Sequence, residues 1–278
     1  MERLNAASLL ILLLPAISVV NTTAGSPHSD TNIAAKTSSW DTVIDARSFA
    51  GYAAFEEKWN YLYPWGADHN GSARMYAGST DHSQVTLTGN NTLRLTAGYI
   101  TADEGKSSKP PFQPIRYHSG SIYAKHQVTI TEEYPEYEVS GSFKAPITKG
   151  TWPAFWLTAV KGWPPELDIL EFKGDSLNWQ NSFITPQQVS TIKTALPDAL
   201  KKWHHYKAVL KRVDEKDLDI FYYVDNRQTG VHRCNFTNKP LWIIINLQME
   251  GSAGSPGPQT STEYYIKDIL VRRLKNNP

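Results

Sequence analysis

The sequence predicts an all-β fold, a sandwich or jelly roll built from many short strands. Three observations indicate this class. Apolar and polar residues alternate along much of the chain after Trp40, turns rich in Gly, Pro and Asn separate the alternating segments, and helical periodicity is nearly absent. A chain of 278 residues is long enough for one large domain of this kind.

The alternating segments predict where the strands lie. Residues 84–88 and 92–96 alternate on either side of the turn 89–91, which is typical of a β-hairpin. In residues 137–144 the aromatic, Val and Gly positions share one face, and the Glu, Ser and Lys positions share the other. Further strands are expected at residues 120–130, 206–213, 219–224, 242–247 and 264–273.

The N-terminal part is expected to lie outside this fold. Arg3 precedes a short apolar run at residues 9–14, and small residues follow as far as Ala24. This is the pattern of a secretory signal peptide, and the run is too short to span a bilayer. We therefore expect a signal peptide at residues 1–24, a flexible polar leader at 25–38 and a single domain at 39–278, in a secreted, extracellular protein.

Composition narrows the classes of partner. The net charge is +1, so no field is expected that would attract nucleic acid or a membrane, and we expect a monomer. The single cysteine, Cys234, excludes an internal disulfide and reads as a small buried residue. In a secreted protein the sequons at Asn70, Asn90 and Asn235 predict glycosylated surface loops.

Three acids interrupt the apolar segment 166–171, namely Glu166, Asp168 and Glu171. On a regular strand Glu166 and Asp168 share a face, and Glu171 falls on the opposite one. A β-bulge near residues 169–170 returns Glu171 to the face of the other two. Bulges of this kind often re-aim side chains beside active sites, so we expect all three acids on one face.

Two carboxyl groups about 5–5.5 Å apart are what a retaining glycosidase requires. The alternatives are an exposed acidic strand face or a metal site. Flanking tryptophans and the secretory pattern favour catalysis, because indole rings form platforms for sugar rings. No group of His, Cys and Asp has zinc spacing, and no cofactor is expected for the catalysis itself.

Residues 150–157 read Gly-Thr-Trp-Pro-Ala-Phe-Trp-Leu and are followed by Trp163 and the acidic segment. This combination resembles glycoside hydrolase family 16, and a weaker likeness extends over most of residues 40–274. The resemblance implies a concanavalin A-like β-jelly roll with a concave substrate cleft. It also implies a structural calcium ion as a feature that occurs on the far face in this family, without placing its ligands.

The resemblance assigns roles to the acids. Glu166 matches the family's nucleophile, Asp168 its assisting aspartate and Glu171 its acid/base. Two residues separate Asp168 from Glu171, which matches the bulged branch of the family.

Four further residues are candidates for substrate binding. Trp156 and Trp163 match positions where family members stack sugar rings, and Trp152 shares a strand face with Trp156. Core packing is the alternative for all three. Lys173 follows Glu171 closely, where it either touches the sugar or neutralises the acids.

Departures from the family pattern bear on the substrate. Pro164 and Pro165 precede the first glutamate where many β-1,3-glucanases have glycine, and residues 179–183 lack the usual histidine. We therefore expect a secreted retaining endo-β-glycosidase acting on a β-1,3-linked polysaccharide, with galactan a candidate beside glucan. A non-catalytic lectin-like protein and a polysaccharide lyase are the alternatives.

Overall fold

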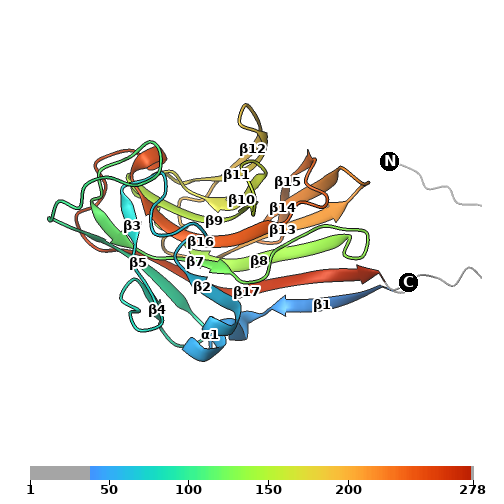
Figure 1. Cartoon of the computed structure of the whole chain (residues 1–278), viewed down its shortest axis with the longest axis horizontal. Coiled ribbons are helices and arrows are strands. Elements are labelled where there is room, and N and C mark those ends of the chain that lie inside the picture. Colours follow the sequence, from blue (N-terminus) through green and yellow to red (C-terminus); the bar gives the residue numbers. More distant parts are fainter. Residues whose placement is uncertain (1–37, 277–278) are drawn as a thin grey trace, which may run out of the picture. The chain divides into compact units, whose positions relative to one another are not determined.

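The computed structural model of the chain describes residues 38–276. Two β-sheets account for most of these residues, and short helical segments lie beside them (Figure 1). The predicted all-β class is confirmed. Residues 1–24 and 25–37, expected to be signal peptide and leader, lie outside the described residues, and strand β1 already begins at Ser38, the last residue of the expected leader.

The larger sheet has ten strands in the order β15-β14-β13-β8-β17-β5-β6-β3, with β1 paired to β17 and β4 paired to β5. All of these pairs are antiparallel except β3 with β6. Its strands are β1 (Ser38–Ile44), β3 (Ala73–Met75), β4 (Val85–Leu87), β5 (Leu93–Tyr99), β6 (Tyr117–Ser119), β8 (Glu136–Lys144), β13 (His204–Arg212), β14 (Leu218–Val224), β15 (Arg227–Cys234) and β17 (Thr262–Asn276).

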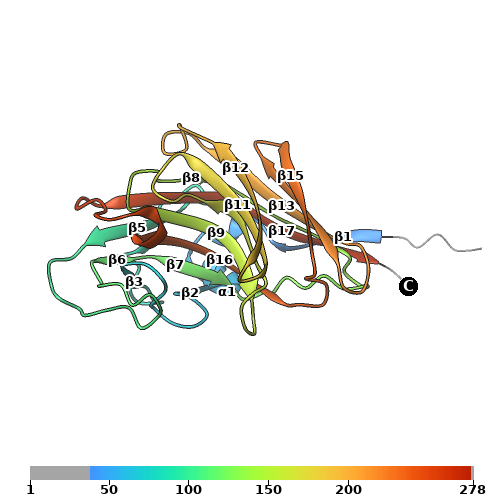
Figure 2. The same ribbon diagram turned by 90° about the horizontal axis from the view of Figure 1, so that it is seen from above.

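The smaller sheet has seven strands in the order β12-β11-β10-β9-β16-β7-β2. Strands β12 and β11 run side by side in Figure 2, as do β9 and β16, and β10 lies between the two pairs. Its strands are β2 (Trp59–Tyr61), β7 (Ser121–Ala124), β9 (Thr151–Ala159), β10 (Glu166–Glu171), β11 (Leu177–Thr185), β12 (Gln188–Ala195) and β16 (Leu241–Met249).

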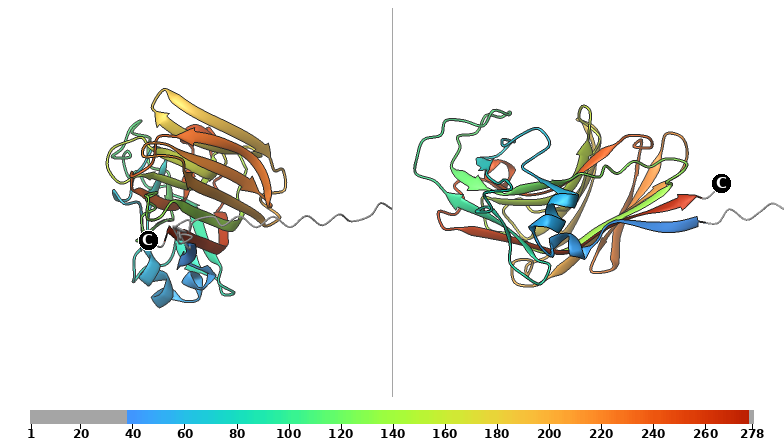
Figure 3. Two further views of the ribbon diagram at one scale, coloured as in Figure 1. Left: turned by 90° about the vertical axis from the view of Figure 1, so that its right-hand side faces the viewer. Right: turned by 60° about the horizontal axis from the view of Figure 1, so that its bottom comes forward.

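The hydrophobic core lies between the two sheets. Phe143 of β8 and Phe155 of β9 meet across it with ring centroids 5.0 Å apart. Every second residue of β8 and β13 points inward, and Val139, Tyr206 and Leu210 are fully buried there. The left panel of Figure 3 shows the two stacked layers. This is the sandwich that alternation predicts.

Most predicted strands are present with shifted ends, and one is wrong in part. The hairpin forms with Val85 opposite Leu95. The strand expected at 120–130 ends at Ala124, and Val128 rejoins β16 only through a single bridge to Leu241. Val128 and Ile130 are nevertheless buried in the core. Their alternation therefore reflects core packing of an irregular segment rather than a continuous ladder.

The short helical segments were not predicted. Helix α1 (Tyr52–Lys58) and the 3-10 helix η1 (Ala46–Phe49) pack outside the sheets, as Figure 3 shows, and η2 (Gly251–Ala253) lies beside β9. Helix α1 buries only Phe55, so seven residues with one core position carry too little periodicity to be recognised. Within residues 38–276, no helix has both the length and the apolar character required to cross a membrane.

Candidate active site

A cavity of about 710 Å³ opens on the face of the smaller sheet that points away from the core. Along β9 the side chains of Trp152, Ala154, Trp156 and Thr158 line this cavity, whereas Phe155 faces the core. Period-two alternation therefore divides β9 into a core face and a cavity face. The shared face that the sequence predicts for Trp152 and Trp156 is confirmed.

Strand β10 carries the three acids onto the same face through a bulge. Asp168 lies opposite Trp156, but Leu170 lies opposite Phe155, so one extra residue interrupts the register at Ile169. Glu171 consequently lies opposite Ala154, a cavity-facing position. All three acids line the cavity. The predicted bulge and the predicted common face are both confirmed.

Each carboxylate is held by a neighbouring side chain. The indole Nε1 of Trp163 donates to Glu166 Oε2 at 2.8 Å, and that of Trp152 donates to Glu171 Oε1 at 2.7 Å. The amide Nδ2 of Asn181, on the adjacent strand β11, donates to Asp168 Oδ2 at 2.8 Å and to Glu171 Oε2 at 2.9 Å. One nitrogen thus bridges two carboxylates and fixes them close together.

Lys173 neutralises part of this negative charge. Its Nζ lies 3.0 Å from Glu171 Oε2 and 4.8 Å from the centroid of the Trp179 ring. Of the two roles that the sequence left open for Lys173, the ion pair is the one formed here. Lys173 lines the cavity as well, so its contact with a sugar stays a prediction.

The three acids cannot all be ionised easily. Burial raises the pKa of Glu166 to about 7; the hydrogen bond from Trp163 opposes this shift and the charge of Glu171 adds to it. Burial, followed by the charges of Glu171 and Glu166, raises the pKa of Asp168 well above its usual value. The cluster therefore retains a proton near neutral pH. General acid catalysis requires a protonated carboxyl group beside an ionised one.

The three tryptophans differ in exposure and in hydrogen bonding. Trp163 is 50% exposed and lies beside Phe183, with ring centroids 5.6 Å apart. Trp152 and Trp156 are only 8% and 6% exposed, although both line the cavity. Trp156 is fixed by its Nε1, which donates to Asn246 Oδ1 at 2.7 Å. Trp163 therefore offers the freest ring face, and the other two form the floor.

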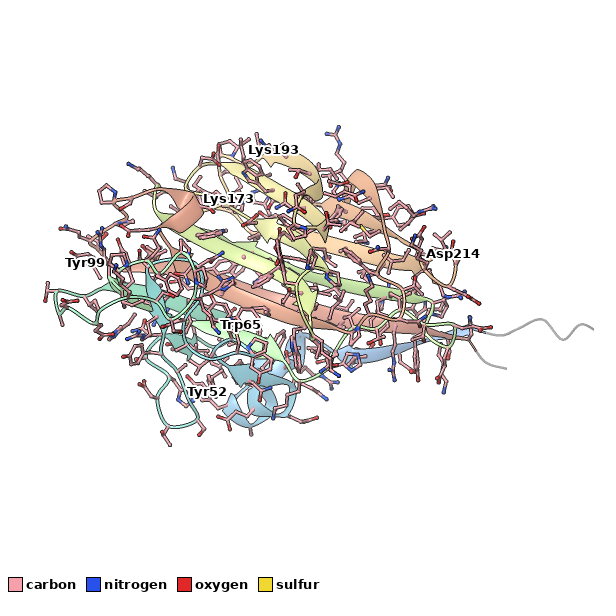
Figure 4. The ribbon with its side chains drawn as sticks, turned by 45° about the horizontal axis from the view of Figure 1, so that its top comes forward. Tyr52, Trp65, Tyr99, Lys173, Lys193 and Asp214 are labelled. Carbon is pink, nitrogen blue, oxygen red and sulfur yellow. The ribbon has the colours of Figure 1, made fainter. Side chains whose placement is uncertain are left out.

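Several cavity residues were not predicted. Asn181 belongs to the segment noted only for lacking a histidine, and its role depends on the β10–β11 register, which a single sequence does not reveal. Trp65 and His69 come from a loop about one hundred residues before the acidic strand, and Asn246 comes from β16. In Figure 4 Trp65 and Lys173 are labelled on the two sides of this face.

The remaining predicted sites are placed as follows. Cys234 is buried, as expected. Asn90 lies in an exposed turn and Asn235 is half-buried, whereas Asn70 lies in a loop that lines the cavity. Glycosylation of all three stays a prediction. Residues 38–276 contain no group of three or more His, Cys, Asp or Glu side chains arranged to hold a metal ion, and the calcium expectation stays untested.

Comparisons with known proteins agree with this geometry. The chain is 43% identical over 238 residues to a galactan endo-β-1,3-galactanase of Flammulina velutipes, covering 84% of this chain and 91% of that protein. It is 27% identical over 176 residues to an endo-1,3-1,4-β-glycanase of Rhizobium meliloti, covering 60% of this chain and 36% of that protein.

Solved structures share the fold. The endo-1,3-β-glucanase from Streptomyces sioyaensis superposes with a TM-score of 0.66 at 19% identity, covering 92% of this chain and all (100%) of that one. Residues 75–265 match the sequence model of the family glycosyl hydrolases family 16. Together with the acidic strand and its aromatic cavity, this match establishes that the chain belongs to glycosyl hydrolase family 16.

Proposed function

We propose that this glycoside hydrolase is a retaining endo-enzyme that cleaves β-1,3-linked galactan, with Glu166 as nucleophile and Glu171 as acid/base. The observation that carries the proposal is the bulged strand β10, which places three carboxylates on one face of an aromatic cavity. The assignment of the two roles follows the family pattern at residues 166–171. The choice of galactan is supported by the relative that is 43% identical.

The chemistry proceeds in two steps. Glu166 attacks the anomeric carbon while the Glu171 carboxyl group gives its proton to the leaving glycosidic oxygen, which forms a glycosyl ester on Glu166. Glu171 then takes a proton from water, and the resulting hydroxide displaces Glu166 from the sugar. Two inversions give a product with the β configuration of the substrate.

The neighbours of Glu166 suit a nucleophile, and those of Glu171 suit the base of the second step, because Lys173, Trp152 and Asn181 all stabilise its ionised form. Trp163 holds Glu166 Oε2 and leaves Oε1 for attack. Asp168 lies between the glutamates and shares the Asn181 amide with Glu171. A proton retained by Asp168 reduces the negative charge against which Glu166 must ionise. Asn181 and Asp168 are therefore positioning residues that act through the two glutamates.

The two alternative functions receive less support. A lectin on this fold requires neither glutamate, yet both are present and both are hydrogen-bonded in the cavity. A lyase requires a Tyr, His or Lys base. Lys173 is ion-paired with Glu171. Among the described residues that line the cavity there is no tyrosine, and burial lowers the pKa of His69 to about 4, which makes it a weak base. Release of reducing ends without an ultraviolet-absorbing unsaturated product separates hydrolase from lyase.

Side-by-side hydrolysis tests the substrate. β-1,3-galactan, laminarin and a mixed-linkage β-glucan are incubated with equal enzyme, and new reducing ends are measured, with the Glu166→Gln variant as the blank. We expect the highest kcat/KM on β-1,3-galactan and oligosaccharides as first products. Preferential hydrolysis of laminarin contradicts the galactan assignment, and monosaccharide as the only first product contradicts endo-cleavage.

Secretion is part of the same proposal. Its support is the apolar run at residues 9–14 followed by small residues, in the part of the chain outside the described residues. Expression of the full chain in a eukaryotic host, followed by N-terminal sequencing of the protein in the medium, tests it. We expect a mature N-terminus close to residue 25, and an intact residue 1 in the cell fraction alone contradicts it.

A further inference from the structure

One wall of the cavity carries a positive charge that the chemistry of the carboxylates does not use. Lys109 is half-buried and lines the cavity beside Trp65 and His69. Within residues 38–276 no carboxylate lies within ion-pair distance of its Nζ; the acid on the neighbouring loop, Asp68, is bound by Arg74 instead. A half-buried ammonium without a carboxylate partner is free to pair with an anion that enters the cavity.

Lys109 does not serve as a counter-ion for the catalytic acids. The lysine whose charge lowers the pKa of both Glu166 and Asp168 is Lys173, and Lys109 is not among the charges that act on them. Its charge instead reaches His69, whose pKa is lowered to about 4 by burial and, to a smaller extent, by the Lys109 charge. His69 therefore stays neutral above pH 5, and the positive charge on this wall belongs to Lys109 alone.

The wall is fixed rather than adaptable. Asp68 accepts from Arg74 Nε at 2.8 Å and from the backbone N–H of Ser108 at 2.8 Å. Ser107 Oγ donates to the carbonyl of His69 at 2.6 Å. These bonds tie the loop of Lys109 to the loop of Trp65 and His69. The lysine backbone is thus held at the edge of the cavity before any substrate arrives.

Aromatic rings beside the lysine provide a surface for a sugar. The His69 ring stacks on Trp156, with centroids 5.8 Å apart and planes at 18°, and Trp65 lies 5.1 Å from His69. The ring nitrogens of His69 have no hydrogen-bond partner among the described side chains, so they are available for sugar hydroxyl groups. Apolar faces, a neutral imidazole and one ammonium suit a sugar that carries an anionic group.

We propose that Lys109 forms an anion-recognising subsite, so that the enzyme prefers β-1,3-galactan chains bearing a carboxylate or sulfate over neutral chains. The proposal rests on the galactanase function proposed above and names a finer substrate class for the same cavity. The anion pairs with the Lys109 ammonium while the sugar ring lies against Trp65 and His69. Because the pair is only partly shielded from water, its contribution falls as ionic strength rises.

Matched oligosaccharides test the subsite. The probes are a β-1,3-galacto-oligosaccharide with one uronic acid, its carboxyl-reduced counterpart, and the same chain with one sulfate ester. We expect a wild-type ratio of kcat/KM, acidic to reduced, of five to ten at low salt, and a ratio near two in 0.5 M NaCl. The sulfated probe is also expected to exceed the reduced probe in kcat/KM, because the ammonium pairs with either anion.

Variants assign that ratio to one residue. Lys109→Met is expected to bring it close to one, and Lys109→Arg is expected to retain most of it. Lys161→Met removes a lysine that is exposed and does not line the cavity, and it is expected to keep the wild-type ratio. Thermal unfolding of each variant verifies the fold. Equal ratios in the wild type and Lys109→Met overturn the proposal.

A binding measurement separates this proposal from the function on which it rests. Titration calorimetry of the acidic and reduced probes against the Glu166→Gln variant reads the subsite without turnover. If the acidic probe binds more than five times as tightly as the reduced probe but no β-1,3-galactan is hydrolysed, the galactanase function is overturned and the subsite is supported. Hydrolysis with ratios near one in both readouts overturns the subsite and keeps the galactanase, and absence of binding by either probe overturns the subsite.

Discussion

Burial of Glu166 makes the stability of the folded chain depend on pH in a specific direction. The pKa of this carboxyl group is about 7 in the folded state, against an ordinary value of 4.5. Between these two values the folded state holds a proton that the unfolded state has lost. The free energy of unfolding therefore falls as pH rises through this window.

The size of the effect follows from the same numbers. Each pKa unit corresponds to 1.36 kcal/mol, so a rise from 4.5 to about 7 costs about 3 kcal/mol of stability by pH 8. Glu166→Gln removes the titration and keeps an oxygen that can accept from Trp163. We expect the variant to match the wild type at pH 4.5 and to be about 1–3 kcal/mol more stable at pH 8.

Urea unfolding at pH 4.5 and pH 8, followed by tryptophan fluorescence, measures this difference. Glu215→Gln, which neutralises an exposed carboxylate in the β13–β14 turn, is the control and is expected to follow the wild type at both pH values. A Glu166→Gln variant that is no more stable than the wild type at pH 8 refutes the burial argument.

Three further predictions concern activity. Trp163→Ala should weaken substrate binding by about 1–3 kcal/mol, and Trp163→Phe should recover part of it, because stacking requires a ring; unchanged KM in a folded Trp163→Ala variant contradicts a place for this ring at the cleft. Asn181→Ala should lower kcat about tenfold to a hundredfold with little change in KM, since it removes two hydrogen bonds to carboxylates; a fall in stability without loss of kcat indicates a structural role only. The acid limb of the kcat/KM profile should lie above pH 4.5, because burial raises the pKa of Glu166, and a limb below pH 4 contradicts that pKa.

The sequence alone was sufficient for the acidic strand because its chemistry is local. Alternation on β10 and one inserted residue determine which way Glu166, Asp168 and Glu171 point, and both are visible within six residues. The same holds for the core and cavity faces of β9. Alternation along one strand does not distinguish the two glutamates. Their division into nucleophile and acid/base therefore comes from the family resemblance.

The rest of the cavity depends on long-range pairing that no local pattern encodes. Asn181 reaches the acids only because β11 pairs with β10 in one register, in which Leu167 lies opposite Ser182. The loops of Trp65 and Lys109 are joined by a hydrogen bond that Asp68 accepts from the backbone N–H of Ser108, forty residues later in the chain. Such contacts follow from the packed fold, and a single sequence does not specify them.

The central claim is that Glu166 forms a covalent bond with the sugar and Glu171 handles the proton. A 2-deoxy-2-fluoro-β-galactosyl donor with an activated leaving group accumulates the glycosyl-enzyme, because the fluorine slows its hydrolysis. Intact mass spectrometry followed by peptide mapping then locates the adduct. We predict one sugar per chain on the peptide containing Glu166, attached to that residue. An adduct on Glu171 or Asp168, or release of an inverted product without any adduct, contradicts the assignment.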